Sequence, residues 1–248
     1  MKKNFYTFVF ITLFLIIISI GSAFAKNLAY NVYKPKAYPT STNFSDMKEK
    51  ILFIVDFSNS MNENLGNKRK IDVALETLSN ILPKINPETW TGLRVYGHKN
   101  GFTANQSCTA SALVSPIKQN NSADIEEQLS SLNAVGWTPI TYSLKKAVES
   151  DFSGFDGQKR IILLSDGGEN CDESPCDYAI NLMQYRDDIK IDVIAFNISD
   201  YDANSQLRCT ALTTSGRFYT ANTASELSHS LDDSLNMHKD VQGMIIKK

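Results

Sequence analysis

The chain of 248 residues has no excess of positive charge, because its 25 Lys and Arg residues are outnumbered by 27 Asp and Glu residues. Removal of residues 1–25 would take away two Lys residues and no acidic one, and would make the remainder more acidic still. Proteins that bind nucleic acids present a basic patch to the phosphates. This balance of charge therefore argues against a nucleic-acid partner.

The sequence also lacks an apolar run of about 20 residues, the length that a helix needs to cross a bilayer. The apolar stretch at residues 8–20 is shorter, follows Lys2 and Lys3, and precedes an A-x-A pattern at residues 23–25. This order of basic, apolar and small residues is typical of a secretory signal peptide. We expect residues 1–25 to be such a peptide, and the protein to be exported to a periplasm or the cell exterior. The membrane would be met only during export, or through an uncleaved signal anchor in the alternative interpretation.

Cysteine is scarce, and the chain has four such residues: Cys108, Cys171, Cys176 and Cys209. An exported protein meets an oxidising compartment, so we expect two disulfides. A zinc site is the competing interpretation, but zinc ligands usually come as closely spaced Cys pairs, and two of these cysteines stand alone. Four cysteines allow three pairings, and sequence spacing does not choose between them.

Short apolar runs indicate the strands. Residues 51–55 and 161–164 are short apolar runs, and residues 191–198 are a third, mostly apolar segment. Such segments are expected of strands buried on both faces of a parallel sheet. Residues 93–96 and 112–114 are weaker candidates without a clear helix between them. We expect these two to form an antiparallel hairpin at one edge of the sheet.

Helical periodicity lies between the apolar runs and predicts helices over residues 71–82, 125–132, 140–148, from Pro175 onward, and 223–235. Strands that alternate with helices predict an α/β domain with a mostly parallel sheet and helices on both faces. We expect this domain to cover residues 48–240. A linker or extended arm would precede it at residues 26–47, and a C-terminal tail would follow at residues 241–248.

Oxygen-bearing side chains stand where two of the predicted buried strands end. Asp56, Ser58 and Ser60 follow the first run, and Asp166 follows the run at residues 161–164. Ligands bind at the carboxyl ends of the strands in open α/β sheets. Thr138 opens the helix predicted between them and could add a third hydroxyl. Each motif alone has an ordinary explanation, such as a helix cap or a strand-ending turn, but hard oxygen ligands suit Mg²⁺, Mn²⁺ or Ca²⁺.

Taken together, the motifs Asp56-x-Ser58-x-Ser60, Thr138 and Asp166-Gly167 resemble the metal-ion-dependent adhesion site of the von Willebrand factor A family. The order and separations match a complete site, and the resemblance covers about residues 48–238. Within the family, the chain most resembles exported bacterial members. It implies a doubly wound, Rossmann-like open sheet of order 3-2-1-4-5-6 with strand 3 antiparallel. The family often has Gly between the two Ser residues, where this chain has Asn59.

The resemblance also implies a role for each residue. Ser58 and Ser60 would bind the metal directly, Thr138 directly or through water, and Asp56 and Asp166 mainly through waters. The ion would be Mg²⁺, with Mn²⁺ or Ca²⁺ as alternatives. Because few anionic ligands come from the protein, the ion stays electrophilic, and a carboxylate from a protein partner can complete its coordination shell.

These expectations describe an exported, metal-dependent protein-binding or adhesion module that is not an enzyme. Two alternatives remain. A metal-dependent hydrolase could use two Asp residues around a divalent ion, but Ser58 stands where a second carboxylate would be useful, and no general base is evident. The third interpretation is a structural subunit of a cell-envelope assembly.

All four cysteines map to the end of the predicted sheet that carries the metal motifs. Cys108 falls between the two edge strands, and Cys209 falls early in a helix expected after residues 191–198. Cys171 and Cys176 flank the acidic loop that follows Asp166. Our hypothesis is that disulfides stiffen this face, with Cys108–Cys171 and Cys176–Cys209 as the favoured pairs among the three pairings.

Overall fold

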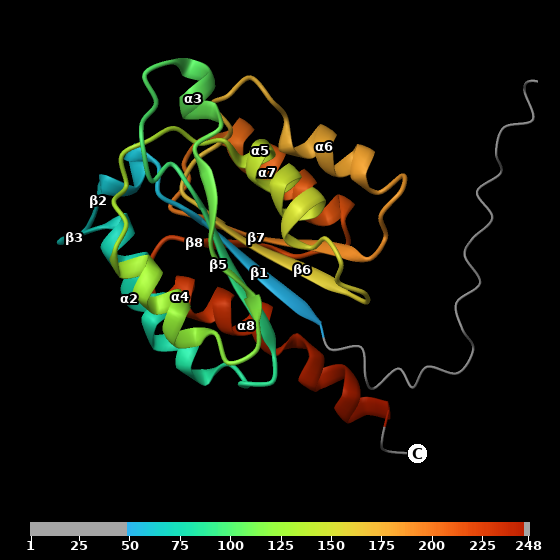
Figure 1. The fold of residues 1–248 in the computed structure, drawn as a ribbon. Helices are drawn as coiled ribbons and strands as arrows, with labels where there is room; N and C mark the ends of the chain where they lie inside the picture. Colours follow the sequence, from blue (N-terminus) through green and yellow to red (C-terminus); the bar gives the residue numbers. More distant parts are fainter. Residues whose placement is uncertain (1–48, 246–248) are drawn as a thin grey trace, which may run out of the picture. The chain divides into compact units, whose positions relative to one another are not determined.

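Six strands form an open sheet in this computed structural model, which describes residues 49–245 and the side chains as far as residue 236 (Figure 1). The strands are β1 (Lys50–Asp56), β4 (Trp90–Tyr96), β5 (Ser111–Lys118), β6 (Lys159–Ser165), β7 (Ile189–Phe196) and β8 (Phe218–Ala221). Their order in the sheet is β5-β4-β1-β6-β7-β8. β5 is antiparallel to β4, and the other neighbours are parallel. The order 3-2-1-4-5-6 with strand 3 antiparallel is therefore confirmed. The signal peptide and linker predicted for residues 1–47 lie outside the described residues.

Helices cover both faces of the sheet, as the sequence predicts. They are α2 (Lys70–Ile81), α3 (Ala104–Cys108), α4 (Ser122–Ser130), α5 (Ile140–Lys146), α6 (Pro175–Leu182), α7 (Tyr201–Thr213) and α8 (Ala224–Ile245). Short elements join them: η2 (Asn59–Asn62), the hairpin β2 (Asn64–Leu65) with β3 (Lys68–Arg69), η3 (Leu82–Lys84) and η4 (Ala147–Asp151). In Figure 1, α2, α4 and α8 lie on one face, and α5, α6 and α7 on the other. Within the described range, no helix is both long and apolar enough to span a bilayer.

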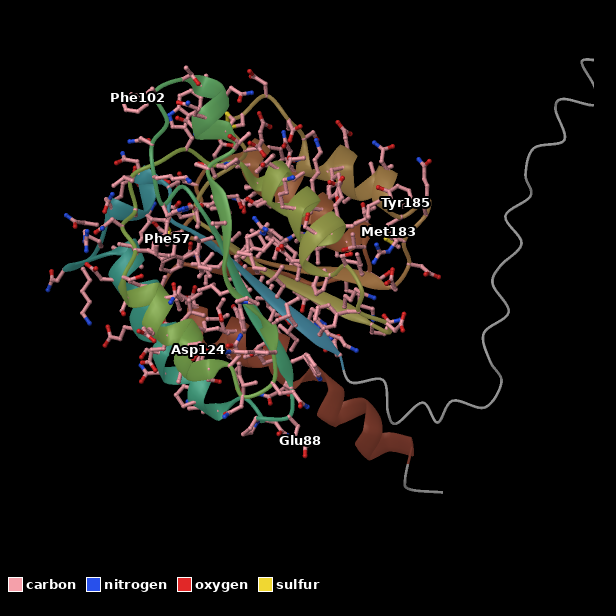
Figure 2. All side chains as sticks on the ribbon, in the orientation of Figure 1. Phe57, Glu88, Phe102, Asp124, Met183 and Tyr185 are labelled. Atoms are coloured by element: carbon pink, nitrogen blue, oxygen red, sulfur yellow. A yellow bond between two sulfur atoms is a disulfide. The ribbon has the colours of Figure 1, made fainter. Side chains whose placement is uncertain are left out.

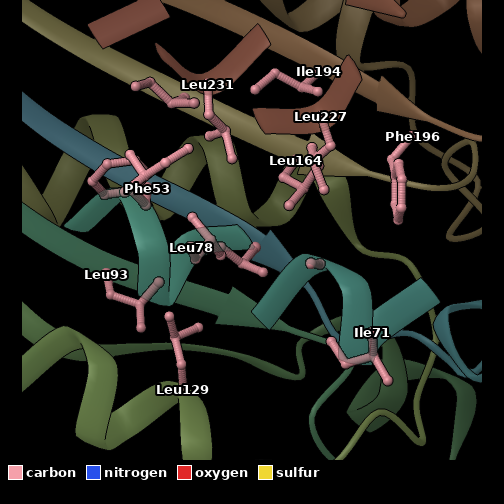
Figure 3. Packing of buried hydrophobic residues seen from close by; sticks show 14 of the residues in the cluster. Phe53, Ile71, Leu78, Leu93, Leu129, Leu164, Ile194, Phe196, Leu227 and Leu231 are labelled. Atoms are coloured by element: carbon pink, nitrogen blue, oxygen red, sulfur yellow. The ribbon is translucent and has the colours of Figure 1, made fainter. Parts of the chain in front are cut away.

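β1 is buried on both faces, which explains its uninterrupted apolar sequence. Phe53 packs on one face with Leu78 of α2 and Leu231 of α8 (Figure 3). Leu52 and Ile54 point to the other face, where they join the cluster that includes α5 and α7. Each fully buried apolar side chain contributes about 1.5–3 kcal/mol relative to leaving it exposed. The two clusters hold β1 firmly, so the residues at its carboxyl end have fixed positions.

The structure departs from the sequence-based expectations at the periphery. β8 has four residues, of which only Ala221 is buried, too short a pattern to be recognised as a strand. The five-residue helix α3 lies between β4 and β5, where we expected no helix. Cys209 lies in the second half of α7, not early in that helix. The last helix, α8, continues to Ile245.

Candidate metal site at the ends of β1 and β6

The two aspartates of the predicted site meet because β1 and β6 are parallel neighbours. Asp56 is the last residue of β1, and Asp166 directly follows the last residue of β6. Both residues are buried, with exposed fractions of 0% for Asp56 and 5% for Asp166. Parallel pairing therefore delivers two carboxylates to one edge of the sheet, where ligands bind in open α/β folds.

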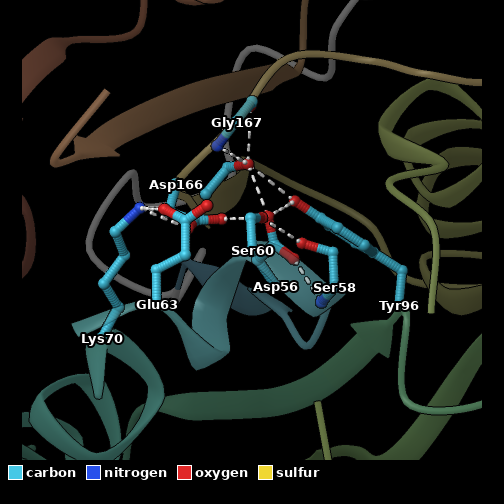
Figure 4. Close-up of polar contacts among 9 residues, drawn as sticks. Asp56, Ser58, Ser60, Glu63, Lys70, Tyr96, Asp166 and Gly167 are labelled. Atoms are coloured by element: carbon cyan, nitrogen blue, oxygen red, sulfur yellow. Dashed lines mark hydrogen bonds and ion pairs between the residues drawn. The ribbon is translucent and has the colours of Figure 1, made fainter. Parts of the chain in front are cut away.

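Two serines connect the end of β1 to Asp166. The Oγ atoms of Ser58 and Ser60 are 2.9 Å apart, and Ser60 Oγ donates to Asp166 Oδ1 at 2.7 Å, between residues 106 positions apart in the chain (Figure 4). Ser58 has an extended backbone and precedes η2, and Ser60 lies within η2. The turn of η2 thus brings both hydroxyls toward the carboxylate. The structure places four of the five predicted metal ligands in one cluster.

The segment that carries Thr138 packs against the same cluster through backbone contacts. Asn59 N donates to Gly136 O at 2.9 Å, which ties this segment to the loop after β1. Thr138 N donates to Asn170 Oδ1 at 2.8 Å, which ties it to the loop after Asp166. Thr138 itself is 5% exposed. The third predicted motif therefore lies between the other two.

Gly97, directly after β4, permits this close packing. A Cβ atom at Gly97 would lie 2.6 Å from Ser58 N and 2.7 Å from Trp137 O, and the residue has a φ of +70°. Both the space and the backbone conformation exclude a larger residue without a local shift. The end of β4, the loop after β1 and the loop before Thr138 thus meet at one glycine.

Asp56 is held by two residues that the sequence did not mark as functional. Tyr96 Oη donates to Asp56 Oδ2 at 2.9 Å, and Ser165 Oγ donates to the same oxygen at 2.8 Å. Ser58 N donates to Oδ1 at 2.7 Å. Tyr96 ends β4 and Ser165 ends β6, so their positions at strand ends beside β1 were the available signal. Donors from three neighbouring strand ends fix the orientation of the carboxylate.

A buried lysine is the third residue that sequence reasoning missed. Lys70 Nζ lies 3.0 Å from Asp166 Oδ2 and 2.7 Å from Glu63 Oε2, and its side chain is 6% exposed. The basic sequence Lys68-Arg69-Lys70 looks like an exposed helix start, and the first two of these residues are indeed exposed. Only the fold shows that the third side chain turns inward.

The electrostatics of the cluster favour a cation. Burial raises the pKa of Asp56 to about 6, and the negative charge of Asp166 adds to this effect. Burial also raises the pKa of Asp166, although hydrogen bonds from Ser60 and Lys70 oppose it. Two neighbouring carboxylates that both resist ionisation become easier to ionise when a positive ion binds between them.

The chemistry of the donors fits a hard divalent ion. The cluster offers hydroxyl and carboxylate oxygens, the ligands of Mg²⁺, Mn²⁺ and Ca²⁺. Among the side chains described, residues 49–236, no group of three or more His, Cys, Asp or Glu side chains gathers that could hold a metal ion. A cleft of about 430 Å³ opens beside the cluster and is lined by Ser60, Glu63, Lys70, Asp166, Asn197 and Asn222, among others. A ligand can therefore approach Ser60 and Asp166 from solvent.

Sequence comparison gives the family. The profile of the von Willebrand factor type A domain matches residues 50–233, from the start of β1 into the first half of α8. The chain belongs to the von Willebrand factor type A domain family. It is similar to the uncharacterized protein YwmD of Bacillus subtilis (strain 168), with 29% identity over 187 residues, 73% of this chain and 82% of YwmD. Von Willebrand factor type A domains are typically modules of adhesion and protein interaction.

Solved structures share the fold at low sequence identity. Proximal thread matrix protein 1 from the mussel byssus, in a structure with a zinc-occupied MIDAS motif, superposes with a TM-score of 0.59 at 21% identity, over 77% of this chain and 46% of that chain. The pilus adhesin SpaC from Lactobacillus rhamnosus GG gives 0.60 at 15% identity, over 79% of this chain and 31% of that chain. This chain spans less than half of either protein, and the likeness shows the von Willebrand factor type A fold.

Two disulfides frame the site with the favoured pairing, Cys108–Cys171 and Cys176–Cys209. The first joins α3 to the loop after Asp166, across a sequence separation of 63 residues. That loop carries Asn170, which accepts from Thr138 N. The second joins α6 to α7. The first disulfide therefore restrains the loop that positions Thr138.

Replacement of both Cys108 and Cys171 by Ser should lower the free energy of unfolding by about 2–4 kcal/mol, because the unfolded chain loses a long-range constraint. Chemical denaturation at neutral pH measures the change. Replacement of Cys176 and Cys209, which close a shorter loop of 33 residues, is the comparison, and we expect a loss of stability there too. An unchanged denaturation midpoint in the first variant would show that this disulfide does not stabilise the fold.

Asp56→Asn should stabilise the metal-free protein at about pH 7.5, because the wild type must keep a buried carboxylate ionised there. A carboxyl with a raised pKa supports folding fully below its unfolded value of 3.8, and this support is lost as the pH rises through about 6. In EDTA, the wild-type melting temperature should therefore rise as the pH falls from about 7.5 to about 5, and that of the variant should rise less. Parallel pH profiles for the two proteins would contradict this account.

Proposed function

We propose that this chain is an exported binding module in which a divalent cation is held at the edge of the sheet and completed by a carboxylate of a protein partner. The residues that would hold the ion are Asp56, Ser58, Ser60, Thr138 and Asp166. The observation that carries the proposal is a hydrogen-bonded chain in which Ser58 Oγ contacts Ser60 Oγ and Ser60 Oγ donates to Asp166 Oδ1. The ion would supply an electrophilic centre; Mg²⁺ is the leading candidate, with Mn²⁺ or Ca²⁺ as alternatives.

The hydrogen bonds of Asp56 and the protonation of Tyr96 favour binding over catalysis at this site. Three donors already engage the Asp56 carboxylate, so it is not free to act as a general base. Burial raises the pKa of Tyr96 well above its usual value, so its phenol stays protonated and is no nucleophile at neutral pH. Hydrolysis needs an activated nucleophile or base beside the metal. An ion held by the cluster would lie beside the cleft that Ser60 and Asp166 line, and would supply an electrophilic centre for a partner carboxylate.

Exposed apolar side chains near the site suit a protein partner. Trp137, next to Thr138, and Val135 are each 39% exposed. Phe102 is fully exposed and projects from the loop before α3, whereas Phe57 lies inside the core (Figure 2). Exposed aromatic residues are enriched in protein interfaces. They could supply contact area around a carboxylate on the metal.

Two further observations support export and adhesion. Both disulfides are of the kind that persists in oxidising compartments. Among proteins of the same fold, one is named a pilus adhesin and another has zinc in its MIDAS motif. The corresponding role here would be adhesion or capture of a protein outside the cytoplasm, through a divalent ion.

Mg²⁺ or Mn²⁺ should raise the melting temperature of the protein, because an ion that binds only the folded state stabilises it by about 2.7 kcal/mol at a hundredfold excess over Kd. Ser60→Ala removes one hydroxyl ligand and should abolish most of this shift. Ser130→Ala, at an exposed position at the end of α4, is the matched control and should respond like the wild type. Differential scanning calorimetry with and without EDTA measures the shift. A full shift in Ser60→Ala would remove Ser60 from the metal site.

Capture of a partner from cell-envelope extracts should require both Mg²⁺ and Asp56. The experiment compares the wild type, the wild type in EDTA, and Asp56→Ala, each shown to be folded by circular dichroism. Capture that survives both EDTA and the substitution would contradict the proposal. Metal-dependent turnover of phosphate or carboxylic esters that is lost in Asp56→Ala would instead favour the hydrolase.

A further inference from the structure

We infer that Lys70 is a tethered counter-ion of the metal site, which keeps the metal-free cluster assembled and weakens its affinity for the ion. The inference rests on the proposed metal function and adds a residue that is not a metal ligand. Its consequence is a loosely held ion with residual positive charge, suited to attract an anionic partner group.

Lys70 is held in place by the segment before it. As the first residue of α2, it follows the hairpin of β2 and β3, and its backbone N–H donates to Glu63 O at 2.9 Å. Its ammonium group also contacts the Glu63 carboxylate at 2.7 Å. The hairpin thus folds Glu63 back over the helix start and directs the lysine side chain toward Asp166.

The Asp166 carboxylate has two differently occupied oxygens. Oδ1 accepts from Ser60 at 2.7 Å, on the side of the hydroxyls that would hold the ion. Oδ2 accepts from Lys70 Nζ at 3.0 Å (Figure 4). The lysine therefore does not fill the ion position. It binds the far side of the same carboxylate, so Lys70 and a metal ion can be present together.

The charge on Lys70 persists in the interior. Its ammonium group contacts two carboxylates, with Nζ 2.7 Å from Glu63 Oε2 and 3.0 Å from Asp166 Oδ2. The Asp166 side chain is 0% exposed, whereas that of Glu63 is 67% exposed. Water screens an exposed charge and hardly screens a buried one. Lys70 therefore acts mainly on Asp166 and on any ion beside it.

Two effects follow from one buried positive charge. Without metal, Lys70 compensates part of the negative charge of Asp56 and Asp166, which would otherwise repel each other in the interior. With metal, the ammonium repels the ion, and one unit charge a few ångströms away changes ion affinity by about tenfold or more. Because Lys70 cancels part of the negative charge of Asp166, a bound ion keeps more of its net positive charge. That charge attracts an incoming carboxylate more strongly.

The test compares binding of Mn²⁺ alone to four variants at constant ionic strength, by isothermal titration calorimetry. Lys70→Met and Lys70→Gln should each bind Mn²⁺ about tenfold more tightly than the wild type. Lys70→Arg keeps the charge and should match the wild type. Lys68→Met is the matched control, because Lys68 is exposed, pairs with exposed Glu76, and its loss changes the net charge equally.

The melting temperature gives a second readout. Lys70→Met should melt below the wild type in EDTA, because the aspartates lose their counter-ion, and Mn²⁺ should close that gap. Lys70→Gln keeps a donor toward Asp166 and serves if Lys70→Met does not fold. Equal or weaker Mn²⁺ binding in the neutral variants would overturn the inference while leaving the metal site intact. If Mn²⁺ binds measurably to the neutral variants but not to the wild type, the inference is supported. If Mn²⁺ binds to none of the proteins, both the inference and the proposed metal function are overturned.

Discussion

β1 pairs in parallel with β4 on one side and with β6 on the other, and the register of the first pairing sets Asp56 opposite Tyr96. Because all three strands run in the same direction, their polar ends meet at one edge of the sheet. The apolar clusters on both faces hold β1 between them. Every hydrogen bond to Asp56 from a neighbouring strand depends on this arrangement, and a shift in register would separate the donors from the carboxylate.

The site is assembled around buried negative charge that the protein compensates in two ways. Asp56 is surrounded by hydrogen-bond donors without formal charge, from Ser58, Tyr96 and Ser165. Asp166 receives a hydroxyl on one oxygen and an ammonium on the other. Buried carboxylates are costly unless paired or hydrogen-bonded. Asp56 is therefore fixed in orientation by neutral donors. Asp166 is fixed in orientation and is also partly neutralised by Lys70.

Sequence reasoning found the features that depend on local pattern and strand position. Five strands, the helices on both faces and the positions of Asp56 and Asp166 follow from apolar runs that end in polar residues. The sixth strand and α3 were missed because elements of four or five residues leave too weak a pattern. Tyr96, Ser165 and Lys70 were missed because their roles depend on contacts between distant segments. Nothing in the sequence separates buried Lys70 from its exposed neighbour Lys68.

The disulfide between Cys108 and Cys171 has a consequence for the thermodynamics of association. Residues 63 positions apart in the chain become one covalently linked surface beside the loop that carries Asn170. A partner that touches both α3 and that loop meets parts that cannot move far apart. Ordering of flexible loops is a major entropic penalty of complex formation. The disulfide completes part of that ordering in the free protein, so a partner that touched both segments would meet a smaller entropic penalty.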